Sequence, residues 1–82
     1  MGHLPDHLQL HRRANLRSLI DELYREGYAS LATQAAVLGI NEEFLRAMLS
    51  GYCIVDAVAR EVEWSMHRRN GWLDDDHRID PG

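Results

Sequence analysis

The chain is poor in cysteine and proline, with one cysteine and two prolines among its 82 residues. A single thiol, Cys53, excludes a disulfide within the chain, so we expect a reducing, cytoplasmic compartment. No apolar run approaches the ~18 residues that a membrane span requires. The N-terminal segment MGHLPDHLQL lacks the basic and apolar regions of a signal peptide. These absences predict a protein with no membrane partner.

The alternation of apolar and polar residues that marks a half-buried β-strand is also missing. Apolar residues recur instead at helical spacing, as in Leu16, Leu19, Ile20 and Leu23. Apolar side chains make up 45% of the chain, which is ordinary for a globular protein. A chain of this length forms one domain with one core. We therefore predict a compact all-α domain.

Negative charge is concentrated toward the C-terminus. The formal net charge is −4, yet eight arginines balance eight acidic residues between positions 12 and 71. Most of the excess acid follows that stretch, at Asp74, Asp75, Asp76 and Asp80. We expect residues 12–75 to form the domain, residues 1–11 to be an arm or the start of the first helix, and residues 76–82 to be a flexible, solvated acidic tail. We also expect the acidic run Asp74–Asp76 that leads into this tail to be solvated.

Cap and turn residues divide the domain into helices. Pro5 suits the first helical position, and Gly27 ends a first helix that runs to about Glu26. Ser30 is placed to cap a second helix over residues 31–38, which Gly39 ends.

The later helices have similar signals. Asn41 is placed to cap a third helix over residues 42–49. Asp56 is a candidate cap for a fourth helix that ends near Arg69, with two arginines in its last turn. We expect Trp72 and Leu73 to fold back onto the core as a short turn or last helix.

The segment from Ser30 to Ser50 has the pattern of a helix-turn-helix. Ala35 is a small residue where two helices cross, Gly39 tolerates the positive φ of a tight turn, and Ile40 is the apolar residue that follows. Apolar residues then anchor the second helix, namely Leu45, Met48 and Leu49. The same residues also fit a helical hairpin with a glycine turn, so this alternative stays open.

On these motifs, the chain resembles the Cro/lambda-repressor (XRE-like) family from roughly Arg13 to His77. The resemblance also rests on two later segments, the AREVE sequence at residues 59–63 and the GWLD sequence at residues 71–74. It implies a five-helix domain that places its third helix in the DNA major groove, commonly as a homodimer on a palindromic operator. It further implies a transcriptional regulator without a cofactor. No nucleophile–base pair or phosphate loop suggests an enzyme.

By this resemblance, the groove-facing side chains are the residues of the third helix that the core does not require, namely Asn41, Glu42, Glu43, Arg46, Ala47 and Ser50. Arg46 suits a guanine edge, and Asn41 suits a phosphate or an adenine. Glu42 or Glu43 suits the amino group of a cytosine. Arg17, helped by Arg12 and Arg13, is expected to contact phosphates from the first helix.

Two departures from the family pattern favour a second interpretation. Leu31 stands where family members often carry glutamine, and Tyr52-Cys53 stands where they often carry a basic residue. Two carboxylates also face the expected groove, although DNA affinity depends largely on neutralising phosphates. The alternative is a protein-interaction module whose acidic third helix docks on a basic surface of a regulator or an RNA polymerase subunit.

Three other features are candidates for sites. His3, His7 and His11 recur every four residues, but Pro5 separates His3 from the helix and leaves two ligands without a third, so we predict no metal site. Apolar residues of the fourth helix and of the Trp72 segment fit either a dimer surface or the monomer core. Trp64 belongs to the same open question.

Overall fold

The structure is a computed structural model that describes residues 6–77. Within this range it contains four α-helices and a short 3-10 helix, without any strand. They are α1 (Asp6–Arg25), α2 (Leu31–Leu38), α3 (Glu42–Leu49), α4 (Asp56–Ser65) and the 3-10 helix η1 (Trp72–Asp74). The predicted all-α class is confirmed. The expected fifth helix is a single 3-10 turn instead.

Two predictions concern segments that lie outside the described residues. These are the start of the first helix at Pro5 and most of the acidic tail, residues 78–82. His3 lies outside them as well.

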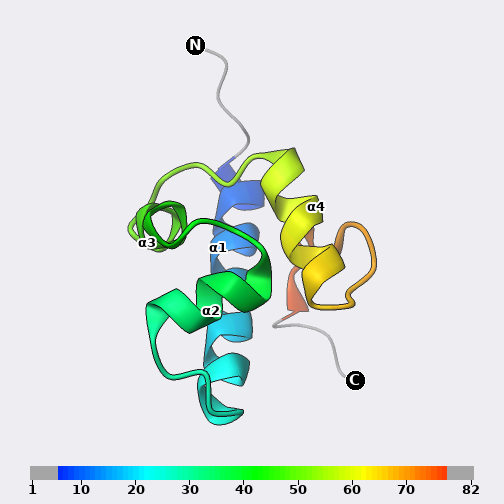
Figure 1. The fold of residues 1–82 in the computed structure, drawn as a ribbon. Coiled ribbons are helices and arrows are strands. Elements are labelled where there is room, and N and C mark those ends of the chain that lie inside the picture. The colour runs from blue at the N-terminus through cyan, green and yellow to red at the C-terminus, as the bar shows by residue number, and fades with distance from the viewer. Residues whose placement is uncertain (1–5, 78–82) are drawn as a thin grey trace.

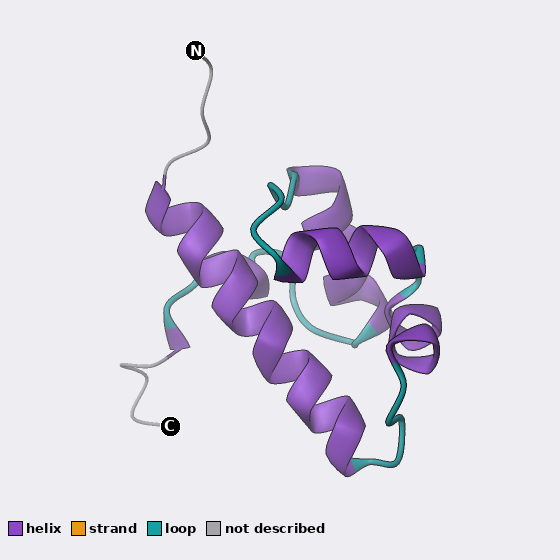
Figure 2. Ribbon diagram, turned by 90° about the vertical axis from the view of Figure 1, so that its left-hand side faces the viewer, coloured by secondary structure: helices purple, strands orange, loops and turns teal. Residues whose placement is uncertain are grey.

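The long helix α1 organises the fold. In the view of Figure 1, α3 is to the left of α1 and α4 is to its right, with α2 crossing in front of it. Figure 2 shows the three shorter α-helices on one side of α1. The turn η1 packs against α1 as well, although about 50 residues of chain separate the two elements.

The core lies where these elements meet. Leu16, Leu19 and Leu23 repeat along one face of α1, and each is at most 2% exposed. The other helices and the loop between α3 and α4 add apolar side chains that are fully buried, namely Leu38, Leu45, Met48, Ile54, Val62 and Leu73. Burying each such side chain contributes ~1.5–3 kcal/mol. Because Leu73 comes from η1, the end of the domain completes the core.

The predicted boundaries of α2 and α3 are confirmed, because local caps fix them. The Ser30 hydroxyl accepts a hydrogen bond from the Thr33 backbone N–H at 3.2 Å. The Asn41 side-chain oxygen accepts one from the Glu43 N–H at 2.8 Å. Between the helices, Gly39 takes a left-handed φ of 76°.

Gly39 is required for space as well as for its backbone conformation. A Cβ atom there would lie 2.8 Å from the Ser65 hydroxyl oxygen and 3.0 Å from a Glu61 carboxylate oxygen. The turn between α2 and α3 therefore packs closely against α4.

The prediction for the fourth helix is wrong at both ends. Val55 occupies the cap position, and the Asp56 carboxylate instead accepts a hydrogen bond from Arg12 at 2.7 Å. The helix ends at Ser65, and His67 just beyond it takes a φ of 57°. Arg68 and Arg69 therefore lie beyond the helix rather than in its last turn.

Asp74 is not part of a solvated acidic run. Its carboxylate accepts hydrogen bonds from Arg12 at 2.7 Å and from Arg60 at 2.9 Å. Neighbouring Asp75 forms an ion pair with Arg69. Pairing with arginines, including Arg12 from the far end of the sequence, therefore holds the start of the acidic segment against the domain.

Candidate functional site

The six predicted site residues of the third helix lie on α3 and at its two ends. Leu45 and Met48 turn into the core and are fully buried. The opposite side faces solvent, where Asn41, Glu43, Arg46 and Ser50 are exposed and Glu42 and Ala47 are half-buried. We call these six residues the α3 face.

Arg46 is the one arginine on the α3 face, and it is already paired. Its guanidinium donates to the Glu42 carboxylate at 2.9 Å, one turn earlier on the same helix. Their side chains are 59% and 43% exposed. Because such an exposed pair stabilises a helix by only about 0.3–0.5 kcal/mol, a ligand with a stronger negative charge can draw Arg46 away from Glu42.

Asn41 serves the start of α3. Its side-chain oxygen accepts hydrogen bonds from the N–H groups of Glu43 and Phe44, at 2.8 and 3.3 Å. A bidentate contact to adenine uses both the oxygen and the nitrogen of an asparagine amide. The cap therefore competes with the predicted adenine contact. The side-chain N–H groups remain able to donate to a phosphate.

Two arginines of α1 lie at the C-terminal end of α3. Arg17 donates to the Leu49 carbonyl at 2.6 Å, and Arg13 donates to the carbonyls of Met48 and Gly51 at 3.1 and 3.0 Å. The carbonyls of Met48 and Leu49 lie at the negative end of the helix dipole of α3, so cations are favourable there. The predicted site residue Arg17 is exposed and keeps further N–H donors for a ligand.

Arg12, in contrast, does not contribute to this surface. It is 1% exposed, and it donates to Asp74, Asp56 and the Ile54 carbonyl. Burial lowers the pKa of Arg12, but the hydrogen bonds that it donates to the two carboxylates and their negative charges outweigh burial and raise it. The expectation that Arg12 helps Arg17 to contact phosphates is therefore wrong.

Arg12 and Glu63 are the two buried members of a polar network that also includes Asp56, Arg60 and Asp74, of which the Asp56 side chain is 77% exposed. We name it the buried polar network after its two buried members. Glu63 is fully buried, and its carboxylate accepts hydrogen bonds from the N–H groups of Gly71 and Leu73. Burial raises the pKa of Asp74, but hydrogen bonds and charge from Arg12 and Arg60 outweigh it and hold that pKa below its ordinary value. The network ties α1, α4 and η1 together.

The link between α1 and the end of α3 could be read only in part from the sequence. Arg13 and Arg17 are four residues apart, so they share a face of α1. Nothing in the sequence indicates which helix end that face meets, because the contacts join residues more than 30 positions apart.

The chain was compared with protein families, curated proteins and solved structures. Neither protein families nor curated proteins nor solved structures give a match to it. Among the described helices, none is both long and apolar enough for a membrane crossing. Between residues 6 and 77, no three histidine, cysteine, aspartate or glutamate side chains come together as metal ligands.

Proposed function

We propose that the chain is a small transcriptional regulator that binds duplex DNA through α3 as a helix-turn-helix, in the manner of the lambda-repressor-like family. One observation carries the proposal. α3 buries Leu45 and Met48 and turns Arg46 and Ser50 outward, while Arg13 and Arg17 lie at its C-terminal end. Three guanidinium groups thus lie on or beside one exposed helix of a width that the major groove accepts.

In this proposal the residues have separate roles. Arg46 leaves Glu42 to donate to a guanine edge, and Arg17 donates to a phosphate. Glu42 or Glu43 accepts from a cytosine amino group. Ala47 and Ser50 lie where the helix approaches the bases, and Asn41 donates to a phosphate while it caps the helix. The protein acts as a homodimer, without a cofactor and without enzymatic activity.

The test is selection of bound sequences from a random DNA library, followed by titration of the selected duplex by fluorescence anisotropy. We expect Arg46→Ala to lower affinity by about tenfold, corresponding to ~1.4 kcal/mol, and to relax the base preference at one position. Binding of the unmodified chain should weaken steeply as the salt concentration rises.

Arg25→Ala is the matched control. Arg25 is exposed and pairs with Asp21 one turn away, as Arg46 pairs with Glu42, but it lies at the end of α1. We expect this variant to bind DNA like the unmodified chain. No binding to any duplex at low salt, or equal losses in the two variants, contradicts the proposal.

A second function is favoured by the ion pair between Glu42 and Arg46. That pair neutralises the arginine of the α3 face and leaves Glu43 as a further exposed carboxylate, which suits a basic protein surface. A photo-crosslinking amino acid at Ser50 separates the two functions in cell extract. Adducts with DNA support the regulator, and a discrete protein adduct that survives nuclease supports the interaction module.

A further inference from the structure

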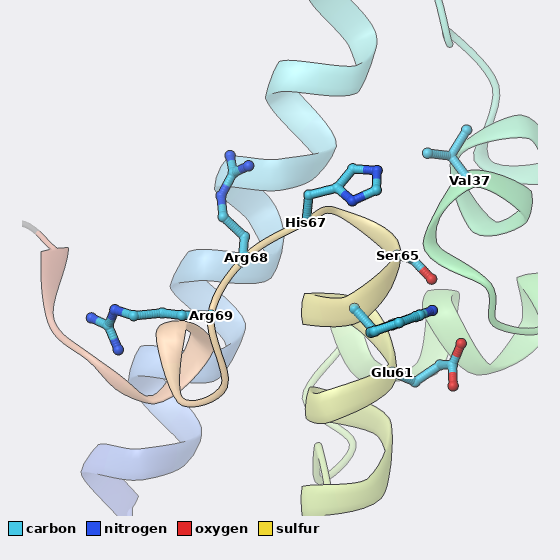
Figure 3. A pocket seen from close by; sticks show the side chains of 7 residues that line it. Val37, Glu61, Ser65, His67, Arg68 and Arg69 are labelled. Carbon is cyan, nitrogen blue, oxygen red and sulfur yellow. The ribbon is translucent and has the colours of Figure 1, made fainter.

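A hollow of about 660 Å³ lies where the C-terminal end of α4 meets α2. Figure 3 shows Val37 of α2 facing the end of α4 that carries Glu61 and Ser65. Trp64 also lines the hollow and is 79% exposed, more than any other large apolar side chain in the described residues. We call Glu61, Trp64 and Ser65 the α4 face, since all three belong to the last part of this helix.

Trp64 offers an exposed aromatic ring to a partner. The other tryptophan, Trp72, is half-buried, and it stacks on the His77 ring at a centroid distance of 4.3 Å while the Arg68 guanidinium lies 5.0 Å from its centroid. Trp64 makes no such contact with the described residues, so it is not part of the core. An exposed tryptophan beside a hollow is typical of the residues that anchor protein interfaces, and its ring is the best of the aromatic rings for a cation.

Two hydrogen-bond acceptors lie next to Trp64 on α4. The Glu61 carboxylate and the Ser65 hydroxyl make no hydrogen bond or ion pair with the described residues. Both approach the same side of Gly39, where a Cβ atom would lie 2.8 Å from the Ser65 oxygen and 3.0 Å from a Glu61 oxygen. The two side chains are one helical turn apart and therefore share a face of α4. A single group with several N–H donors can reach both of them.

The charges around the hollow favour a cation. Arg68 and Arg69 also line it, but Figure 3 shows both side chains pointing away from Glu61. They are paired with Glu22 and Asp75. With histidine counted as neutral, Glu61 is the charged lining residue that the described residues leave unpaired. The hollow therefore suits a positively charged group that donates hydrogen bonds.

We propose that the α4 face binds an arginine side chain in an exposed segment of a partner protein. The guanidinium plane stacks on Trp64, and its N–H groups donate to the Glu61 carboxylate and the Ser65 hydroxyl. Arginine fits better than lysine, because its planar group presents several donors in a fixed fork and stacks on aromatic rings. Val37, half-buried on the α2 side of the hollow, contacts an apolar side chain next to the arginine.

The inference goes beyond the proposed function and does not depend on it. The α4 face shares no residue with the α3 face, so the partner leaves the predicted DNA contacts of the chain uncovered. A chain that binds the partner but no duplex overturns the proposed function and leaves this inference intact.

The experiment is a titration of the isotope-labelled full chain with a peptide, followed by two-dimensional NMR. The probe is a pentapeptide with blocked ends and a central arginine, flanked by leucine and then glycine on each side. We expect the indole N–H signal of Trp64 and the backbone signals of Glu61 and Ser65 to shift with a Kd of about 1 mM or below. Replacing the arginine of the peptide by lysine should weaken binding about threefold. Citrulline, which keeps the shape but not the charge, should weaken it at least about tenfold.

Variants of the α4 face, each with a matched control, locate the binding. Trp64→Ala should weaken binding of the arginine peptide at least about tenfold, and Glu61→Gln about fivefold. Tyr24→Ala is the control for the first variant, because Tyr24 is an aromatic residue of α1 that is 61% exposed. Glu43→Gln is the control for the second, because it removes an exposed carboxylate from the α3 face instead. Circular dichroism checks that all four variants remain folded.

Three results would overturn the inference. They are the absence of shifts at the α4 face at every peptide concentration, equal binding of the arginine and lysine peptides, and equal losses in Glu61→Gln and Glu43→Gln. If Trp64→Ala does not fold, Glu61→Gln and the three peptides still decide the outcome. Binding that only Glu43→Gln weakens would overturn it as well, and would favour the second function, in which a basic partner docks on the α3 face.

Discussion

The buried polar network and the α3 face use similar residues in opposite ways. Arg12 is 1% exposed and makes hydrogen bonds to two carboxylates and a carbonyl. Arg46 is 59% exposed in its side chain and has one partner, on its own helix. Arg12 connects segments that are distant in the sequence, whereas Arg46 contacts only a residue of its own helix, α3. Polar side chains of the network therefore hold the fold, and those of the α3 face remain available to a ligand.

Arg12→Met should have the largest effect on stability and tests this contrast directly. The change removes the donor to the Asp56 carboxylate, one of two donors to the Ile54 carbonyl and one of two cations from Asp74. We expect the free energy of unfolding to fall by about 3 kcal/mol. Urea denaturation measures it.

Arg46→Met is the control for Arg12→Met, because it removes the same group from an exposed pair. Its effect on the free energy of unfolding should stay within about 0.5 kcal/mol. Similar losses in the two variants would show that burial does not separate the two regions.

Asp74→Asn should have the next largest effect, and it tests how the stabilisation by the buried polar network depends on pH. Its hydrogen bonds from Arg12 and Arg60 involve charges, so we expect a loss of about 2 kcal/mol at neutral pH. The pKa of Asp74 is lower in the folded chain than its ordinary value of 3.8. Its stabilisation is therefore complete above about pH 5 and is lost as pH falls through the folded pKa. Unfolding titrations between pH 7 and pH 3, as rough limits, measure it.

Asp75→Asn is the neighbouring control, since Asp75 pairs with an exposed arginine, Arg69. We expect a change of no more than about 0.5 kcal/mol at neutral pH. An equal acid-dependent loss in the unmodified chain and in Asp74→Asn would mean that another carboxylate carries the effect.

Apart from the two control variants, Asn41→Ala has the smallest expected effect, and it tests whether the α3 face is only a ligand surface. The loss of the cap should cost about 1 kcal/mol of stability, whereas Asn41→Ser should restore most of it. Thermal unfolding gives the comparison. If Asn41 also contacts DNA, both variants should bind the selected duplex more weakly, although only the alanine variant is less stable.

How well the sequence predicts a structural feature depends on how far apart along the chain the interacting residues are. The boundaries of α2 and α3 could be predicted because Ser30, Gly39 and Asn41 act on backbone groups within a few residues. The pairing of Glu42 with Arg46 follows from their spacing of one turn.

The wrong predictions concern side chains whose partners lie far away in the sequence. Asp56 fits an N-cap by local rules, but Arg12, 44 positions earlier, takes its carboxylate. Asp74 resembles the start of a solvated tail until α1 supplies Arg12. At the α3 face, the outward side chains followed from the helical period, while the position of Arg13 and Arg17 needed the packing of α1 on α3.

The pairing of Arg12 with Asp74 across 62 positions also bears on how the chain acquires its structure during synthesis. Until Asp74 and Leu73 leave the ribosome, α1 has neither its principal ion partner nor the side chain that closes the core. Contacts of such long range close late, because a large loop must be ordered before they form. The helices can form early, but cooperative folding must wait for nearly all of the domain to emerge.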